Sequence, residues 1–427
     1  MILNDLAEII YAPAKALKRI VENPKYLGAI IVLLLFIAVT VGYEYAQFGK
    51  TFTEQTSPTV DQLPSYINTT IWAAGPSVTL SNNSVDYYNY SVYVAALGTE
   101  PTDPTGYFNL FGNGSLEING TNTNNVTAQT ISDAFNVNCG SNNFQNLSMA
   151  IKLATPQSVP QSASITLYSL NSSNSYARDL TSLLSNQSAV NLWQNLTLPV
   201  GANAQGWVPA GAPSWGNITA LAFDFTYSST SNVTIRIGAL FFGGEYQSPI
   251  QYNSEGLALQ FLQVFSLQFL FSWFLLTGLI YLFFKGLKAT VTWKPVFISV
   301  AMVLFVMVIR GVVCLLAALT LPVSYYPYDL SLGVRFDSFG AIYYPAEAVS
   351  KLALSSQGIY NSITSATQGF HFLTEAMFVI SYIWLGGLCT LFIGQLKPEF
   401  SMAKRVTIAG VSVIATILLL LLLVGVV

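Results

Sequence analysis

Residues 27–43 read LGAIIVLLLFIAVTVGY, an unbroken apolar run with no charged residue and no proline. A helix that crosses the hydrocarbon core of a bilayer needs about 20 mostly apolar residues. Four further segments meet this requirement, namely Leu257–Phe284, Pro295–Leu319, Leu373–Ile393 and Val406–Val427. Only 9% of the 427 residues are charged, whereas an average soluble protein has about 25%. The sequence therefore predicts a membrane α-helical bundle with five transmembrane helices.

Lysine and arginine predict the orientation of this bundle. Ten basic residues precede span one or lie between spans two and three or four and five: Lys15, Lys18, Arg19, Lys25, Lys285, Lys288, Lys294, Lys397, Lys404 and Arg405. In a five-span chain these segments share one side, and basic clusters favour the cytoplasm. We therefore expect a plasma-membrane protein whose residues 1–26 are cytoplasmic and whose C-terminus lies outside. Because no small-x-small cleavage site follows residues 27–45, we expect that span to stay as an anchor.

Residues 46–255 differ from the rest of the chain, because asparagine, serine, threonine and glycine replace the long apolar runs. N-x-S/T sequons occur only in this stretch: Asn68, Asn82, Asn89, Asn113, Asn119, Asn125, Asn146, Asn171, Asn186, Asn195, Asn217 and Asn232. N-linked glycans are bulky, solubilising surface groups. The stretch is therefore predicted to be an N-glycosylated extracytoplasmic domain. Its few titratable groups suit an acidic exterior, and the surface of an archaeon is our hypothesis.

This domain is predicted to be an all-β sandwich. Residues 220–227 read ALAFDFTY and residues 233–241 read VTIRIGALF, and in both segments apolar side chains recur at every second position. Such alternation between turns of Gly, Asn and Ser is typical of antiparallel strands with one buried face. The residues expected to share that face are Leu221, Phe223, Phe225 and Tyr227 in the first segment and Val233, Ile235 and Ile237 in the second.

The end of the domain resembles carbohydrate-binding-module and galactose-binding-like jelly rolls. The similar segments are WQNLTLPVG (193–201), GWVPAGAPSWGNITALAFDFTYSS (206–229) and SNVTIRIGALFFGG (231–244). The resemblance implies a jelly-roll fold that binds glycans. Trp207 and Trp215, in a loop rich in Gly and Pro, are the candidate ligand-binding residues, and the alternative for each is a place in the core. Where that family often has Asp in its last strand this chain has Gly238, so the family's own sugar or calcium site is not carried over.

The helical part resembles the Yip-type five-span membrane protein family over residues 1–45 and 256–427. YAPAKALKRIVENPKYLGAIIVLLLFIAV (11–39) matches its basic, proline-punctuated entry, and SYIWLGGLCTLFIGQ (381–395) matches its fourth span. The resemblance implies a cytoplasmic N-terminus, five helices and an outer C-terminus, with the β-domain as an insertion. Residues 2–21 have the apolar and polar faces of an amphipathic helix, and we expect this helix to lie on the inner leaflet.

Polar residues inside the predicted spans are candidates for function, because charges within a bilayer are costly. Arg310 lies in span three, and Glu375, near the start of span four, is its predicted partner. The pair fits either an ion path or a purely structural role. Gln260, Gln263 and Gln268 of span two are expected to bond across helices. The outer loop at about 322–372 is rich in tyrosine and is expected to seat the β-domain.

Several functions are not favoured by this composition. The three scattered cysteines and the single histidine do not have the spacing of a zinc-binding motif. The net charge of −3 gives no sign of the basic surface that binds nucleic acid. We therefore predict no metal, no cofactor and no enzymatic activity. The expected function is a membrane-anchored cell-surface glycoprotein that binds a surface glycan or surface-layer protein. The alternative is a transporter, a channel or an accessory subunit of a larger membrane complex.

Overall fold

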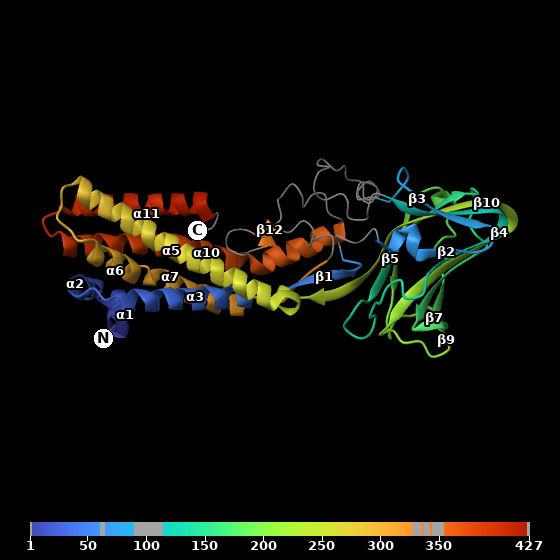
Figure 1. The fold of residues 1–427 in the computed structure, drawn as a ribbon, viewed down its shortest axis with the longest axis horizontal. Helices are drawn as coiled ribbons and strands as arrows, with labels where there is room; N and C mark the ends of the chain where they lie inside the picture. The colour runs from blue at the N-terminus through green and yellow to red at the C-terminus, as the bar shows by residue number, and fades with distance from the viewer. Residues whose placement is uncertain are drawn as a thin grey trace.

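The computed structural model describes residues 2–59, 65–88, 114–327, 335–336, 342–343 and 354–424. The molecule is elongated, with a bundle of helices at one end and a β-domain at the other (Figure 1). The chain enters the β-domain from helix α3 and leaves it into helix α5, so the domain is inserted into the helical part.

Within the described residues, five helical segments are long and apolar enough to cross a membrane, as the sequence predicts. They are α3 (Tyr26–Phe48), α5 (Pro249–Gly286), α6 (Trp293–Val303) continued by α7 (Phe305–Leu319), α10 (Leu354–Leu396) and α11 (Met402–Val424). The connections α5–α6 and α10–α11, which carry basic residues, lie with α2 at the end of the bundle far from the β-domain (Figure 1).

Two of these helices are longer than a membrane crossing. Helices α5 and α10 contain 38 and 43 residues, or about 57 and 65 Å at 1.5 Å per residue, whereas the hydrocarbon core is about 30 Å thick. Helix α10 begins at Leu354, within the outer loop predicted at about 322–372. The placement of this segment outside the membrane stays a prediction. Its helix was missed because Ser, Thr and Gln dominate the first turns and hydropathy marks only the apolar part of the helix.

The N-terminal segment also differs from its prediction. It forms two helices, α1 (Ile2–Tyr11) and α2 (Pro13–Glu22), because Pro13 fits the first turn of a helix but cannot continue one. Their apolar side chains are buried in the bundle: Leu6, Ile9, Ala16, Leu17 and Ile20. The expectation that this stripe lies in the inner leaflet was therefore wrong, since α6 and α10 pack against α2 and cover it.

The β-domain is a large antiparallel β-sandwich. Its strands are β1 (Thr51–Ser57), β2 (Trp72–Ala74), β3 (Val78–Asn83), β4 (Ser115–Thr130), β5 (Asn146–Thr155), β6 (Ser162–Ser169), β7 (Asn171–Asp179), β8 (Gln194–Pro199), β9 (Trp207–Ala210) and β10 (Ile218–Gln247). The segment after α7 adds β11 (Ser324–Tyr326), and β12 (Arg335–Phe336) pairs with β13 (Ile342–Tyr343). Short 3-10 helices cover Thr69–Ile71 and Gln187–Ala189.

A long ribbon of two strands generates both layers. Strands β4 and β10 pair from Ala222 opposite Gln129 to Ile237 opposite Leu116. The first half of β10 also pairs with β6, and its second half pairs with β5. One layer is thus β2-β4-β10-β6-β7-β9, and the other is β3-β4-β10-β5-β8. The strands predicted at 220–227 and 233–241 are one strand, whose register shifts at the exposed bend between Thr226 and Ser231.

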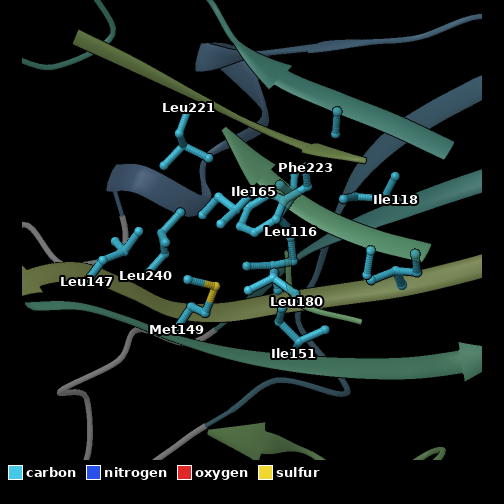
Figure 2. Close-up of a cluster of buried hydrophobic side chains, with 14 of the residues drawn as sticks. Leu116, Ile118, Leu147, Met149, Ile151, Ile165, Leu180, Leu221, Phe223 and Leu240 are labelled. Atoms are coloured by element: carbon cyan, nitrogen blue, oxygen red, sulfur yellow. The ribbon is translucent and has the colours of Figure 1, made fainter. Parts of the chain in front are cut away.

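The core lies between the two layers, and the predicted alternation is confirmed there. Leu221, Phe223 and Phe225 are fully buried, and Figure 2 shows Phe223 among Ile165 and Leu116. Tyr227, Val233, Ile235 and Ile237 belong to the same cluster. Cys139 is also buried in it as a free thiol, and burial raises its pKa to about 12, which keeps the thiol protonated and unreactive.

Two strands join the β-domain directly to the bundle. Helix α3 passes into β1 through Gly49 and Lys50, and β10 passes into α5 through Ser248 alone. Strands β1 and β10 pair with each other, and β11 pairs with β1 in parallel from Ser324 opposite Thr51. The expectation that the segment after span three seats the β-domain is confirmed for β11. We call β1, β11 and the end of β10 the junction strands.

Candidate functional site

The two tryptophans singled out in the sequence lie together at one edge of the sandwich. Trp207 begins the edge strand β9, and Trp215 lies in the loop that follows it. Their ring centroids are 5.7 Å apart at 82°. The Trp215 ring stacks on Tyr176 of β7 at 3.9 Å and 11°, and the Arg178 guanidinium lies 5.7 Å from the Trp207 ring. We call these four residues the aromatic edge.

Hydrogen bonds fix the rings of the aromatic edge. The Trp207 indole donates to the Pro199 carbonyl at 2.7 Å, and the Tyr176 hydroxyl donates to the Pro213 carbonyl at 2.9 Å. Both tryptophans are half-buried and pack against the core. Next to them Val208 is 67% exposed. The edge is thus a rigid aromatic surface whose rings are partly accessible, which combines the two alternatives that the sequence left open.

The remaining tryptophans of the domain lie elsewhere. Trp72 is buried in the core and stacks on Phe223. Trp193 is half-buried near the other layer, where its indole donates to Asp86 Oδ1 at 3.2 Å. Only Trp207 and Trp215 therefore form a tryptophan pair within the described residues.

A network of four charges crosses the outer face of the second layer. Arg236 of β10 pairs with Glu117 of β4, with Nε 2.7 Å from Oε2, and also with Asp86. Lys152 of β5 pairs with Asp86, with Nζ 2.7 Å from Oδ2. The four side chains are 14–29% exposed. Nothing in the sequence pattern identified this network, since Asp86 lies far along the chain from the strands that it joins.

The network lowers the pKa of its acids. Burial raises the pKa of Glu117, but hydrogen bonds from Asn83, Asn119 and Arg236 outweigh burial and bring the pKa to about 2. The pKa of Asp86 is likewise lowered, since Lys152, Arg236 and Trp193 outweigh the opposing effect of burial. Both groups therefore stay ionised in mildly acidic solution.

A cavity of about 90 Å³ lies inside the bundle, and all five spans line it. Arg310 of α7, Gln268 of α5 and Glu44 of α3 are among its polar residues. Of the three span-two glutamines, only Gln268 reaches the cavity. Gln260 and Gln263 are exposed, at least 23 residues or about 35 Å from the Gly286 end of α5.

Arg310 does not pair with Glu375 among the described residues. No ion pair within 4.0 Å between described residues joins Arg310 to Glu375, and Glu375 is exposed on α10. The Arg310 guanidinium instead lies 5.0 Å from the ring centre of Phe378, one turn further along α10. That prediction was wrong because depth along a span does not determine which side of the helix a residue occupies.

The sequons differ in accessibility. Seven of the described ones have exposed asparagines: Asn68, Asn82, Asn125, Asn171, Asn186, Asn195 and Asn232. Asn119, Asn146 and Asn217 are half-buried, while Asn89 and Asn113 lie outside the described residues. Asn119 donates from Nδ2, the atom that would carry a glycan, to Glu117 Oε1 at 3.1 Å.

This difference predicts which sites carry glycans. In a host that N-glycosylates the chain, peptide mapping of the folded protein is expected to find glycans at the seven exposed asparagines and to find Asn119 unmodified. A glycan on Asn119 Nδ2 would compete with the hydrogen bond that this atom donates to Glu117. High occupancy at Asn119 with the fold intact would contradict the expectation.

Comparison with known proteins does not assign the chain to a family. No family model matches the chain, and no curated protein matches it. A family 11 carbohydrate-binding module from Clostridium thermocellum, in complex with a β-1,3-1,4-mixed-linked tetrasaccharide, is 11% identical, with a TM-score of 0.24 over 44% of this chain and 94% of that chain. A carbohydrate-binding module of the β-sandwich superfamily is 11% identical, with a TM-score of 0.25 over 43% and 60%. At these scores the modules do not decide what the β-domain binds, and both family resemblances remain predictions.

Proposed function

We propose that this chain is a membrane-anchored cell-surface protein whose β-domain binds a glycan or a glycosylated surface-layer protein through the aromatic edge. The helices would hold it in the plasma membrane, with the basic end of the bundle in the cytoplasm and the β-domain outside. In this proposal the chain has no catalytic role and needs no cofactor. N-linked glycans on the exposed sequons would keep the rest of the domain soluble.

The aromatic edge is the observation that carries the proposal. A pyranose ring has one face of C–H groups, which packs on an indole face, while its hydroxyls need donors and acceptors at the rim. Trp207 and Trp215 supply the rings, and Arg178 adds a donor beside them. Hydrogen bonds hold Trp207 and Tyr176 in place before any ligand arrives, which lowers the entropy cost of binding.

The proposal is tested with the full chain in lipid nanodiscs on a glycan array. We expect saturable binding that falls at least about tenfold in Trp207→Ala and in Trp215→Ala, because truncating a tryptophan that anchors a ligand commonly costs about 2 kcal/mol or more. Trp193→Ala is the matched control, since it removes a half-buried tryptophan from the other layer. Equal binding by the wild type and both edge variants would refute a role for the aromatic edge.

A further inference from the structure

The end of the bundle far from the β-domain carries a connected group of lysines and aromatic rings. We call it the basic rim and define it by six residues: Tyr26, Tyr281, Lys285, Lys288, Trp293 and Lys294. They come from the start of α3, the end of α5, the connection between α5 and α6, and the start of α6. The Tyr281 and Trp293 rings are in contact, with centroids 5.1 Å apart at 86°. All of these residues except Tyr281 are exposed.

The three lysines have no acidic partner among the described residues. No ion pair within 4.0 Å in the described part of the chain involves any of them, and residues 256–328 contain no Asp or Glu. Lys285 Nζ lies 5.2 Å from the centre of the Tyr281 ring. Lys294 Nζ lies 5.2 Å from the centre of the Tyr26 ring. A ring attracts an ammonium group without neutralising its charge, and the ammonium has three N–H donors, so both lysines can still bind an anion.

The turn that ends α5 does not account for Lys288. The N–H of Ala289 donates to the Phe284 carbonyl at 2.8 Å. The N–H of Lys288 donates to the Lys285 carbonyl at 2.9 Å. In this helix ending, the Schellman motif, the residue at the position of Lys288 is usually glycine, because its φ is positive. Lys288 has a φ of 57°, and glycine would form the same turn with less strain. The side chain of Lys288 therefore contributes nothing that the turn requires.

Helix dipoles and topology account for only part of the basic rim. A cation is favourable in the last turn of a helix, where Lys285 lies, but unfavourable in the first turn, where Lys294 lies. The preference of basic residues for the cytoplasmic side explains why lysines occur at one end of the bundle. It does not explain why two of them lie on aromatic rings. Binding of an anion accounts for all three lysines together.

The position of the basic rim along the helices indicates which anion it meets. Exposed apolar side chains begin directly beside it, at Leu27 of α3 and Leu282 of α5. Trp and Tyr rings in such positions lie at the level of the lipid headgroups. With the helices in a bilayer, as proposed above, the three ammonium groups are at the depth of the lipid phosphates.

We propose that the basic rim binds the headgroup of an anionic phospholipid, whose phosphate oxygens accept hydrogen bonds from the lysine ammonium groups. Clusters of lysine beside a membrane span attract anionic lipids, each lysine strengthening binding by about fivefold. The proposal rests on the part of the proposed function that places the helices in a bilayer. It does not involve the aromatic edge, so a failure of glycan binding and a failure of lipid binding are distinguishable.

Native mass spectrometry of the full chain in detergent tests the proposal, because it resolves the first lipid that binds. The probes are dioleoylphosphatidylglycerol, which is anionic, and dioleoylphosphatidylcholine, which is zwitterionic and has the same acyl chains. We expect the first phosphatidylglycerol to bind at least about tenfold more tightly than the first phosphatidylcholine, since each of the three lysines adds to the attraction. Equal affinities of the two lipids would overturn the proposal.

Two triple variants with the same loss of charge locate the site. Replacing Lys285, Lys288 and Lys294 by Gln is expected to reduce the preference for phosphatidylglycerol to within about twofold. The matched control replaces Lys15, Lys18 and Lys397 by Gln. These three lysines belong to the basic end of the bundle and each pairs with an acid. The control should keep the preference, and an equal loss in both variants would overturn the proposal in favour of general surface charge.

The single variant Lys288→Gly keeps the test valid if the triple variant does not fold. Glycine suits the positive φ of this position, so the melting temperature should be unchanged or higher. The preference for phosphatidylglycerol should nevertheless fall by about fivefold, as expected for the loss of one lysine beside a phosphate. An unchanged lipid preference in this folded variant would contradict the assignment of Lys288 to the site.

Discussion

Phe223→Ala is expected to destabilise the β-domain by about 3–5 kcal/mol, the usual cost of removing a fully buried phenylalanine. Phe223 is completely buried between the layers and stacks on Trp72 and Phe225. Alanine would leave a cavity that the long β4–β10 ribbon cannot close without shifting both layers. A typical domain has a total stability of about 5–15 kcal/mol, so this single change removes a large part of it.

Urea titration followed by pulse proteolysis of the full chain measures this effect, because the protease cleaves the unfolded domain. Val85→Ala is the control, since Val85 is 91% exposed and should change the midpoint by less than about 0.5 kcal/mol. A Phe223→Ala midpoint close to that of Val85→Ala would mean that the two layers do not share one core.

Glu117 is expected to stabilise the domain at neutral pH and to lose this contribution in acid. Its pKa is lowered from 4.5 to about 2 in the folded domain. A lowered folded pKa gives stability that is fully present above pH 4.5 and is lost as the pH falls toward 2. The shift corresponds to roughly 2–3 kcal/mol, because one pKa unit is about 1.4 kcal/mol and the side chain is 16% exposed, which screens part of it.

The variant Glu117→Gln tests this pH-dependent contribution to stability. It should be less stable than the wild type at pH 7, and the difference should vanish near pH 2, where the wild-type carboxyl is protonated. Asp133→Asn is the control, because Asp133 is an exposed carboxylate outside the network. Tryptophan fluorescence during urea unfolding at pH 7, 4 and 2 measures both. A Glu117→Gln deficit that persists unchanged at pH 2 would exclude titration of Glu117 as the cause.

Features with a local signal could be predicted from the sequence. Apolar runs located all five helical segments, because the length of an apolar run directly indicates a helix that can cross a membrane. Leu221, Phe223 and Phe225 were assigned to the core because strands alternate with a period of two. Trp207 and Trp215, which the sequence analysis named as candidates, lie close together because only a short loop separates them. Each of these inferences uses residues close together in the chain.

Features that depend on distant segments could not be predicted in this way. Asp86 meets Arg236 across 150 positions, and no periodicity relates them. Glu44, rather than Glu375, lines the cavity with Arg310 because the packing of α3 against α7 determines which side chains meet. The covering of α1 and α2 by the bundle is another such case, since an amphipathic stripe fits lipid and protein equally well. The Yip-type and jelly-roll family assignments, and glycosylation, stay predictions.

The junction strands have a mechanical consequence. Helix α3 continues into β1 and β10 continues into α5 with almost no intervening residues. Because β1 and β10 also hydrogen-bond to each other, the β-domain is held by two paired connections rather than by one flexible linker. A tether of one flexible linker would let the domain tumble. Here a tilt of the helices, such as a thinner bilayer would cause, would displace the far end of the β-domain. A force on the β-domain would be distributed over the two helices α3 and α5.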